Sequence, residues 1–345
     1  MTENYTPEIT EESEDLYEHH RITVDPGQSL LRIDKFLFNR IEGVSRNKIQ
    51  HAAHAGNILV NNLPVKPNYK IKPLDVISIV LPQPLREFEV IPENIPFQIM
   101  YEDDDVLVIN KEAGMVVHPG HGNYTGTLLN GLAYYYAGQN DVTPSLIHRI
   151  DKDTSGVLLI GKNEFAQSVL GKQFFEHTIH RNYLAIVWGD FKENQGTITG
   201  NIGRNPHDRL QMFVFADGEQ GKHAITHWEV VERFGYVTLV ECRLETGRTH
   251  QIRAHMRFIG HPLFNDARYG GDQILKGTTF SKYKQFINNC YKILPRQALH
   301  ARSLGFVHPV TNKKMYFETP LPPDMTEVVE KWRHYSQHRD LFEAE

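Results

Sequence analysis

A cluster of prolines early in the 345-residue chain limits what the chain can fold into. The four residues are Pro82, Pro84, Pro92 and Pro96. Proline has no backbone N–H and disfavours a helical conformation in the preceding residue, so neither a helix nor a central strand can run through this segment. The chain is long enough for two domains. We therefore predict a linker at residues 83–96 between a small domain, 21–82, and a large domain, 97–345.

The net charge of the chain is −5, but the charges are unevenly distributed. Residues 1–20 contain seven acidic residues and no lysine or arginine, which predicts an acidic, disordered leader. Residues 21–82 carry nine basic residues against four acidic ones, which gives this segment a charge of +5. The whole-chain value disfavours a polyanionic partner, whereas the charge of the small domain favours one.

The composition also excludes several protein classes. The two cysteines, Cys242 and Cys290, are far apart and have no close second cysteine, so neither a disulfide framework nor a cysteine-based zinc site is expected. No apolar run approaches the roughly 18 residues of a membrane span, and the acidic N-terminus is unlike a signal peptide. We expect a cytoplasmic monomer that has no membrane partner.

The small domain shows the pattern of two helices followed by short strands. Apolar residues recur every three or four positions over residues 30–41, which predicts an amphipathic helix. A second helix is expected over residues 46–53, between Ser45 as N-cap and Gly56 as the residue that ends it. The predicted strands are residues 58–60, 64–65 and 76–80.

In the large domain, short apolar runs alternate with turn signals. Strands are predicted at residues 106–109, 157–160, 183–187, 237–240 and 304–307. Helices are predicted at residues 128–136, 164–177, 249–259 and 325–335. The helices are too few and too irregularly placed for regular βαβ winding, so we predict a mixed α+β fold.

The densest group of functional side chains is H-R-I-D-K-D-T-S-G, residues 148–156. Its acidic and hydroxyl residues match the start of a calcium-binding loop, but the twelfth position is Lys162, where a glutamate is required. In an aspartyl-phosphate enzyme, Thr-Gly-Thr would follow the Asp-Lys pair, and it is absent here. A capped turn accounts for residues 153–155. It does not account for Asp151.

A second group is L-E-T-G-R-T-H-Q-I-R-A-H-M-R-F-I-G-H-P, residues 244–262. Thr249 is expected to cap the predicted helix. The polar face of that helix would carry His250, Arg253 and Arg257. His250 and His255 are five residues apart with no glutamate between them, so the pattern of a zinc protease is absent. Arg248 would stand where the helix begins, and there it can approach a carboxylate at the end of a neighbouring strand.

Together these motifs resemble the RluA family of RNA pseudouridine synthases. The resemblance also includes R-N-Y at 181–183 and G-H-P-L-x-x-D-x-x-Y-G-G at 260–271, and it covers about residues 30–320. Ile150 stands where the family often has leucine. The resemblance implies a catalytic domain with a mixed, largely antiparallel sheet and flanking helices.

The resemblance also implies roles for individual residues. Asp151 would be the catalytic aspartate, Tyr183 the tyrosine beside the base, and Arg248 the partner of the aspartate. Burial alone raises the pKa of an aspartate, whereas a cation close by lowers it by roughly one to three units, and we assign this effect to Arg248. The hydroxyl of Tyr183 could take part in proton transfer while its ring stacks on the uracil. Further candidates for binding RNA are His148, Arg149, His250 and Arg253.

The small domain resembles the alpha-L, or S-four type, RNA-binding domain, which is a small α/β fold. By this resemblance Arg32, Arg46 and Lys48 contact RNA phosphates, and such contacts position the RNA without reading its sequence. Family members that carry this domain modify large-subunit ribosomal RNA. The resemblance therefore implies 23S ribosomal RNA as substrate, with transfer RNA as the alternative.

The conversion of uridine to pseudouridine breaks the N1–C1′ bond and joins C5 to C1′ without redox change or group transfer. One ionised carboxylate can serve this chemistry, so we expect neither a cofactor nor a metal. The uridine would have to be flipped out of structured RNA. Two other interpretations remain open: a metal-dependent RNA hydrolase that uses Asp151, Asp153 and the acidic run 103–105, and an RNA-binding protein without activity.

Overall fold

The computed structural model describes residues 17–41, 46–54, 56–81, 90–119, 123–139, 142, 144–206, 208 and 211–338. The chain divides into two compact units, residues 1–89 and 90–345. Each unit has an apolar core of its own, and each is described by itself. In the described ranges, no helix is both long and apolar enough to cross a membrane.

The smaller unit combines a four-stranded sheet, in the order β1-β6-β3-β4, with two helices. Its strands are β1 (Tyr17–Thr23), β3 (Ile58–Val60), β4 (Leu63–Pro64) and β6 (Val76–Leu81), with a separate pair formed by β2 (Leu31–Arg32) and β5 (Lys70–Ile71). Its helices are α1 (Ile33–Arg40) and α2 (Arg46–His54). The core between sheet and helices contains Ile33, Leu37, Ile49 and Ile77.

Two boundaries of the small domain differ from those predicted. The acidic leader was predicted to extend to residue 20, but residues 17–20 belong to β1, which pairs antiparallel with β6. They form a strand because β6 offers them unpaired backbone groups along one edge. Residues 1–16 lie outside the described part of the chain. The first helix was predicted from residue 30 and begins at Ile33, because Leu31 and Arg32 pair with β5.

The larger unit is built on an eleven-stranded sheet whose main path is β13-β12-β14-β15-β11-β16-β10-β8-β7, with β9 beside β10 and β17 beside β16. All of its pairings are antiparallel except the short parallel contact between β10 and β16. The strands are β7 (Gln98–Glu102), β8 (Val106–Lys111), β9 (Ser145–Leu146), β10 (Ser155–Gly161), β11 (His180–Trp188), β12 (Gln195–Arg204), β13 (Met212–Phe215), β14 (Lys222–Arg233), β15 (Val237–Leu244), β16 (Leu299–Val307) and β17 (Lys314–Glu318). The predicted α+β class, with a largely antiparallel sheet, is confirmed.

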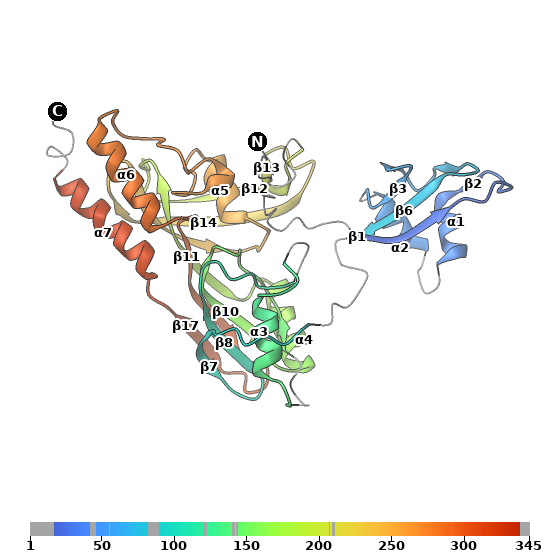
Figure 1. Ribbon diagram of the computed structural model, residues 1–345, viewed down its shortest axis with the longest axis horizontal. Coiled ribbons are helices and arrows are strands. Elements are labelled where there is room, and N and C mark those ends of the chain that lie inside the picture. Colours follow the sequence, from blue (N-terminus) through green and yellow to red (C-terminus); the bar gives the residue numbers. More distant parts are fainter. Residues whose placement is uncertain are drawn as a thin grey trace, which may run out of the picture. The chain divides into compact units, whose positions relative to one another are not determined.

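Helices cover both faces of this sheet. They are α3 (Leu128–Tyr135), α4 (Glu164–Phe175), α5 (Gln251–Phe258), α6 (Ser281–Ile293) and α7 (Pro323–Gln337). The alternating side chains of β11 separate two of the cores: Tyr183 and Ala185 pack in the cluster that contains α3 and α5 residues, whereas Leu184 and Ile186 pack in the cluster that contains α6 and α7 residues. Figure 1 shows α6 and α7 side by side, in agreement with their mutual contacts.

Residues 90–96 were predicted as part of the linker but are held by the larger unit. The backbone N–H of Glu93 donates to the carbonyl of Asn130 at 3.1 Å, and the Asn130 side chain donates to the carbonyl of Ile91 at 2.9 Å. The extended conformation that proline imposes leaves such backbone groups free to pair with α3. Residues 82–89 lie outside the described ranges.

Pairing in the sheet brings three separate segments of sequence together. Gly156 of β10 is paired with Ala301 of β16, which is paired with Tyr183 of β11, which in turn is paired with Cys242 of β15. The segment that precedes β10, the start of β11 and the segment that follows β15 are therefore neighbours. These segments contain the two motifs that the sequence analysis singled out.

Candidate active site

Asp151 lies in the loop that leads into β10, and basic side chains hold the backbone of this loop. The buried Lys111 donates from Nζ to the carbonyl of Lys152 at 2.8 Å. Arg296 donates from Nη1 to the carbonyl of Asp153 at 2.9 Å. Neither anchor was predicted from the sequence. The available signal was a lysine that closely follows the apolar run 106–109, because a buried charge needs partners.

The close approach of β10 to β16 depends on Gly156. Its φ is +117°, and a Cβ at this position would lie 2.1 Å from the carbonyl oxygen of Ala301. Only glycine avoids both the strained conformation and the clash. This contact fixes the end of the Asp151 loop against the centre of the sheet.

The carboxylate of Asp151 forms an ion pair with Arg253 of α5. The distance from Arg253 Nη1 to Asp151 Oδ2 is 3.0 Å. The same guanidinium donates to both carboxylate oxygens of the buried Asp266, at 2.7 and 2.9 Å. Arg253 is 5% exposed. Asp266 therefore orients the arginine, and the arginine supplies the positive charge beside Asp151.

His250 contributes to the same site. Its Nε2 lies 3.9 Å from Asp151 Oδ2, and its Nδ1 lies 3.0 Å from the hydroxyl of Tyr269. That hydroxyl accepts the backbone N–H of Met212, so it can donate its own hydrogen to Nδ1, which leaves the imidazole hydrogen on Nε2, facing Asp151. Burial lowers the pKa of His250 to about 4, so the ring is neutral at neutral pH.

The electrostatic balance keeps Asp151 ionised. Burial acts to raise the pKa of its carboxyl group, but the positive charges of His250 and Arg253 outweigh burial, and the pKa lies below its usual value. Since His250 is neutral at neutral pH, Arg253 is the main counter-charge there. Arg149, which is exposed, also lowers this pKa and is therefore near the site.

Tyr183 is buried on the α5 side of β11 and interacts electrostatically with Asp151. Burial raises the pKa of the phenol, and the negative charge of Asp151 raises it further. Tyr183 therefore keeps its proton at neutral pH. A protonated hydroxyl beside an ionised carboxylate can donate or relay a proton.

Arg248 is not the partner of Asp151. Its Nε donates to the backbone carbonyl of His223 at 3.1 Å, and its backbone N–H donates to the side chain of Gln251 at 3.0 Å. The chain turns through the left-handed conformation at His250, with φ +51°, before α5 begins. This turn directs Arg248 to β14 and leaves the next arginine of the motif, Arg253, beside the carboxylate. Because of this turn the N-cap residue of α5 is His250, and the prediction of Thr249 as N-cap is wrong.

Two of the residues predicted to bind RNA have structural roles instead. His148 accepts the backbone N–H of Leu159 at its Nε2 and stacks on Phe174. Burial lowers its pKa to about 3, so it carries no charge for a phosphate. Arg253 is committed to its two carboxylates. Arg149 is exposed and stays a prediction as an RNA contact.

In the smaller unit, Arg32 and Arg46 converge on Asp34. Arg32 donates to both carboxylate oxygens of Asp34 at 3.0 Å, and Arg46 donates to Oδ2 at 2.9 and 3.1 Å. Gln50 donates to the same oxygen. Burial acts to raise the pKa of Asp34, but these donors lower it to about 2. Both arginine side chains remain 42% exposed, whereas the side chain of Lys48 lies outside the described part.

Asp103, Asp105 and His308 bring potential metal ligands close together. His308 Nδ1, however, accepts backbone N–H groups of Val310 and Thr311, and its Nε2 therefore donates to Asp103 at 2.9 Å. Both ring nitrogens are thus engaged in hydrogen bonds that hold a turn. This arrangement does not favour the metal-dependent hydrolase interpretation.

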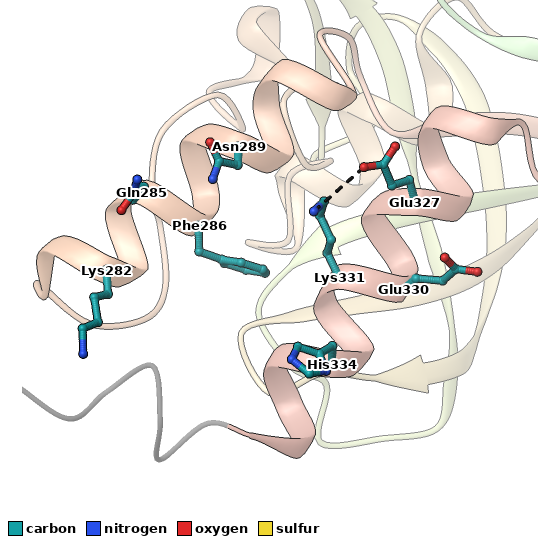
Figure 2. A pocket seen from close by; sticks show the side chains of 8 residues that line it. All are labelled: Lys282, Gln285, Phe286, Asn289, Glu327, Glu330, Lys331 and His334. Carbon is teal, nitrogen blue, oxygen red and sulfur yellow. Dashed lines mark ion pairs between the residues drawn. The ribbon is translucent and has the colours of Figure 1, made fainter.

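A groove of about 640 Å³ lies between α6 and α7. Figure 2 shows Phe286 pointing from α6 towards α7, where its ring stacks on Tyr335 with centroids 4.8 Å apart. Lys331 and Glu327 form an ion pair within α7. None of the lining side chains is a predicted site residue, so the groove is separate from the Asp151 site.

Comparison with known families identifies both units. Residues 105–258 match the family described as RNA pseudouridylate synthase, and residues 31–77 match the S4 domain. The first match contains Asp151, Tyr183 and Arg253. The second contains Arg32, Arg46 and Asp34.

Relatives match over most of the chain. An uncharacterized RNA pseudouridine synthase of Chlorobaculum parvum is 44% identical over 319 residues, which cover 90% of this chain and 97% of that protein. A protein of Zymomonas mobilis named ribosomal large subunit pseudouridine synthase D is 39% identical over 306 residues, 85% of this chain and 91% of that protein.

Solved structures support the fold. Human RNA pseudouridylate synthase domain containing 4 superposes with a TM-score of 0.53 at 23% identity, and covers 68% of this chain and 93% of that one. Human RNA pseudouridylate synthase domain containing 1 gives a TM-score of 0.50 at 25% identity, with 70% and 96% covered. Both share the fold of about two thirds of this chain.

Proposed function

The chain belongs to the family of RNA pseudouridine synthases and is an RNA uridine isomerase, and from this premise we propose that it modifies uridines of large-subunit ribosomal RNA, with Asp151 as the catalytic group. The proposed substrate is supported by relatives named large subunit pseudouridine synthase D and by the S4 domain match. A ribosomal substrate also agrees with the expected location in the cytoplasm.

The Asp151–Arg253 ion pair is the observation that supports the catalytic assignment. An aspartate that is only 21% exposed in its side chain stays ionised because a guanidinium lies 3.0 Å away. The carboxylate can attack the sugar or the base, or take a proton from the sugar, when the N1–C1′ bond breaks. The uracil then turns, C5 bonds to C1′, and the proton on C5 is lost while N1 gains one, so no atom enters or leaves overall.

Tyr183 is proposed to act at the base. Its ring is held by the sheet on the side of the site that contains α5, and its hydroxyl keeps a proton at neutral pH. It can stack on the uracil and relay the C5 proton, directly or through water. Arg149 is proposed to help hold the RNA around the uridine that leaves the helix, since it is exposed next to Asp151.

The catalytic assignment is tested with Asp151→Asn. Asp266 still holds Arg253 in this variant, so the fold and RNA affinity should be nearly unchanged, while the nucleophilic or basic carboxylate is lost. We expect pseudouridine formation, measured as tritium release from RNA that contains [5-³H]uridine, to fall below detection. Asp153→Asn is the matched control in the same loop, and it should retain activity. Turnover by Asp151→Asn would reject the mechanism.

The substrate is tested by mapping pseudouridine in total RNA from cells with and without the protein. We expect one or a few positions of large-subunit ribosomal RNA to lose the modification, and expression of the wild type, but not of Asp151→Asn, to restore them. Positions lost only from transfer RNA would replace the proposed substrate and leave the chemistry intact.

A further inference from the structure

Arg181 of β11 is a buried cation that has no anionic partner among the described residues. The residue is 7% exposed, and its Nε is enclosed with no hydrogen-bond acceptor. Within the residues that the structure describes, no hydrogen bond or ion pair reaches its guanidinium. Arg253, Arg296 and Arg302, in contrast, each have a carboxylate partner. Buried charges in proteins are normally paired, because desolvation is otherwise uncompensated.

The guanidinium lies between β11, which also carries Tyr183, and the loop before α5. Arg181 and Tyr183 are two residues apart on β11, so their side chains emerge on the same face of the sheet. A Cβ on Gly247 would lie 2.5 Å from Arg181 Nη1, so glycine at this position makes room for the guanidinium. Arg181 also acts electrostatically on Tyr183, whose pKa it lowers against the opposing effect of burial.

The neighbours of Arg181 do not satisfy its N–H groups. The Phe174 ring lies 5.4 Å from the guanidinium carbon and contacts only its flat face. His148 accepts the N–H of Leu159 at Nε2, so its Nδ1 carries the ring hydrogen and cannot accept another. Asp151 is paired with Arg253. The guanidinium N–H groups of Arg181 can therefore bind an anion that is not part of the described chain.

We propose that Arg181 binds a backbone phosphate of the substrate RNA, next to the uridine that enters the site. The inference rests on the proposed function, since it requires an RNA substrate. A uridine that leaves the helix brings its flanking phosphodiesters to the edge of the catalytic pocket. A guanidinium binds such a group through parallel N–H···O contacts, and these contacts are strong where water is excluded.

Arg181→Met removes the charge at similar length, and Arg181→Lys retains it. Both variants are compared with the wild type on a ribosomal RNA fragment that contains a uridine that the wild type converts. The RNA is prepared with normal phosphates or with a neutral methylphosphonate on the 5′ or the 3′ side of that uridine. In single-turnover assays of the wild type, one of the two replacements should raise the RNA concentration needed for half-saturation by about tenfold. Arg181→Met should show the same loss with normal RNA and no further loss with that replacement, and Arg181→Lys should be intermediate.

If Arg181→Met binds normal RNA as tightly as the wild type, or if it stays as sensitive as the wild type to both replacements, the phosphate proposal is wrong. The second result would indicate a contact with uracil instead. If the wild type itself does not modify the ribosomal fragment, the proposed substrate is wrong, and the same comparison is made on the RNA that it does modify.

Thermal stability without RNA separates a binding role from a structural one. Arg181→Met removes an unpaired buried charge, so its melting temperature should be equal to or higher than that of the wild type. Arg296→Met is the matched comparison, because Arg296 is buried and paired with Asp324, and its melting temperature should fall. A lower melting temperature for Arg181→Met, together with the loss of RNA binding, would assign Arg181 to the fold and overturn the proposal.

Discussion

Arg253 holds two carboxylates at once, the partly exposed Asp151 and the buried Asp266. The two contacts to Asp266 fix the plane of the guanidinium, so the remaining Nη1 can only face Asp151. The ring of Tyr269 lies 5.0 Å from the guanidinium carbon and supports it from one side. The arginine is therefore a rigid donor, and the ionisation of Asp151 depends on it.

This dependence predicts a change in the pH profile. In Arg253→Gln, the effect of burial on Asp151 is no longer opposed, so the pKa of the carboxyl group rises. The acid limb of kcat/KM should move up by about one to three pH units, so that activity is lost at a higher pH than in the wild type. Arg248→Gln is the control and should leave the limb in place, because Arg248 donates to the His223 carbonyl and not to Asp151. An acid limb that stays in place in Arg253→Gln would contradict the assignment.

The difference between Arg248 and Arg253 shows the limit of the sequence at this scale. Both arginines belong to one motif, and both could reach the same carboxylate from a helix that begins at Thr249. The left-handed conformation of His250 decides between them, and no local pattern predicts a positive φ at a histidine. Asp151 and Tyr183 could be named because the motifs bear a strong resemblance to a known family. Their catalytic roles stay predictions.

At the scale of elements, the parallel contact between β10 and β16 positions the site. It is limited to Ser155 with His300 and Gly156 with Ala301. The hydroxyl of Ser155 also forms a hydrogen bond with the His300 ring at 2.9 Å. Because the Asp151 loop ends at this contact, any displacement of β10 moves the carboxylate relative to Arg253.

Gly156→Ala should therefore lower both stability and activity. The added methyl group meets the Ala301 carbonyl at a strained φ, and we expect a loss of at least about 2 kcal/mol in the free energy of unfolding, measured by urea denaturation. The rate constant of pseudouridine formation should fall in the fraction that remains folded. Gly171→Ala in α4 is the control: a Cβ there contacts nothing within 4 Å, and helix propensity predicts a small gain in stability. Equal behaviour of the two variants would show that the contact tolerates movement.

Elements with a clear apolar pattern could be predicted from the sequence, and elements without one could not. The apolar runs of β8, β10 and β11 are buried on both faces and were predicted as strands. The long strands β12 and β14 contain threonine, glycine and charged residues because they are only partly buried, and they were not predicted. The helix α6 was not predicted either, because its buried Tyr283, Ile287 and Cys290 have helical spacing but stand among lysines and asparagines.

At the scale of the whole molecule, four histidines of the larger unit are held neutral. Burial lowers the pKa of His148 to about 3 and the pKa values of His250, His255 and His300 to about 4. In the unfolded chain the same groups titrate near pH 6.5. As the pH falls from about 6.5 to about 4, the unfolded state binds protons that the folded state does not.

The stability of the larger unit should therefore decrease with acid in this window. Each histidine contributes stability that is present above its unfolded pKa and is lost as the pH falls through its folded pKa, so unfolding takes up as many as about four protons. The urea midpoint, followed by the fluorescence of the three tryptophans, all of which belong to this unit, should fall steadily from pH 6.5 to 4.5. His300→Gln should reduce the proton uptake by about one. A midpoint independent of pH would refute the prediction.

Asp34 has the same sign of charge as RNA, and a count of charges would class it as unfavourable for binding. The structure gives it the opposite effect. Free arginines lose about 0.5–1.5 kcal/mol of side-chain entropy each when a partner immobilises them. Asp34 has already immobilised Arg32 and Arg46, the proposed phosphate contacts, so this ordering takes place when the chain folds and not when RNA arrives. A buried acidic residue can in this way increase the affinity of a basic surface for a polyanion.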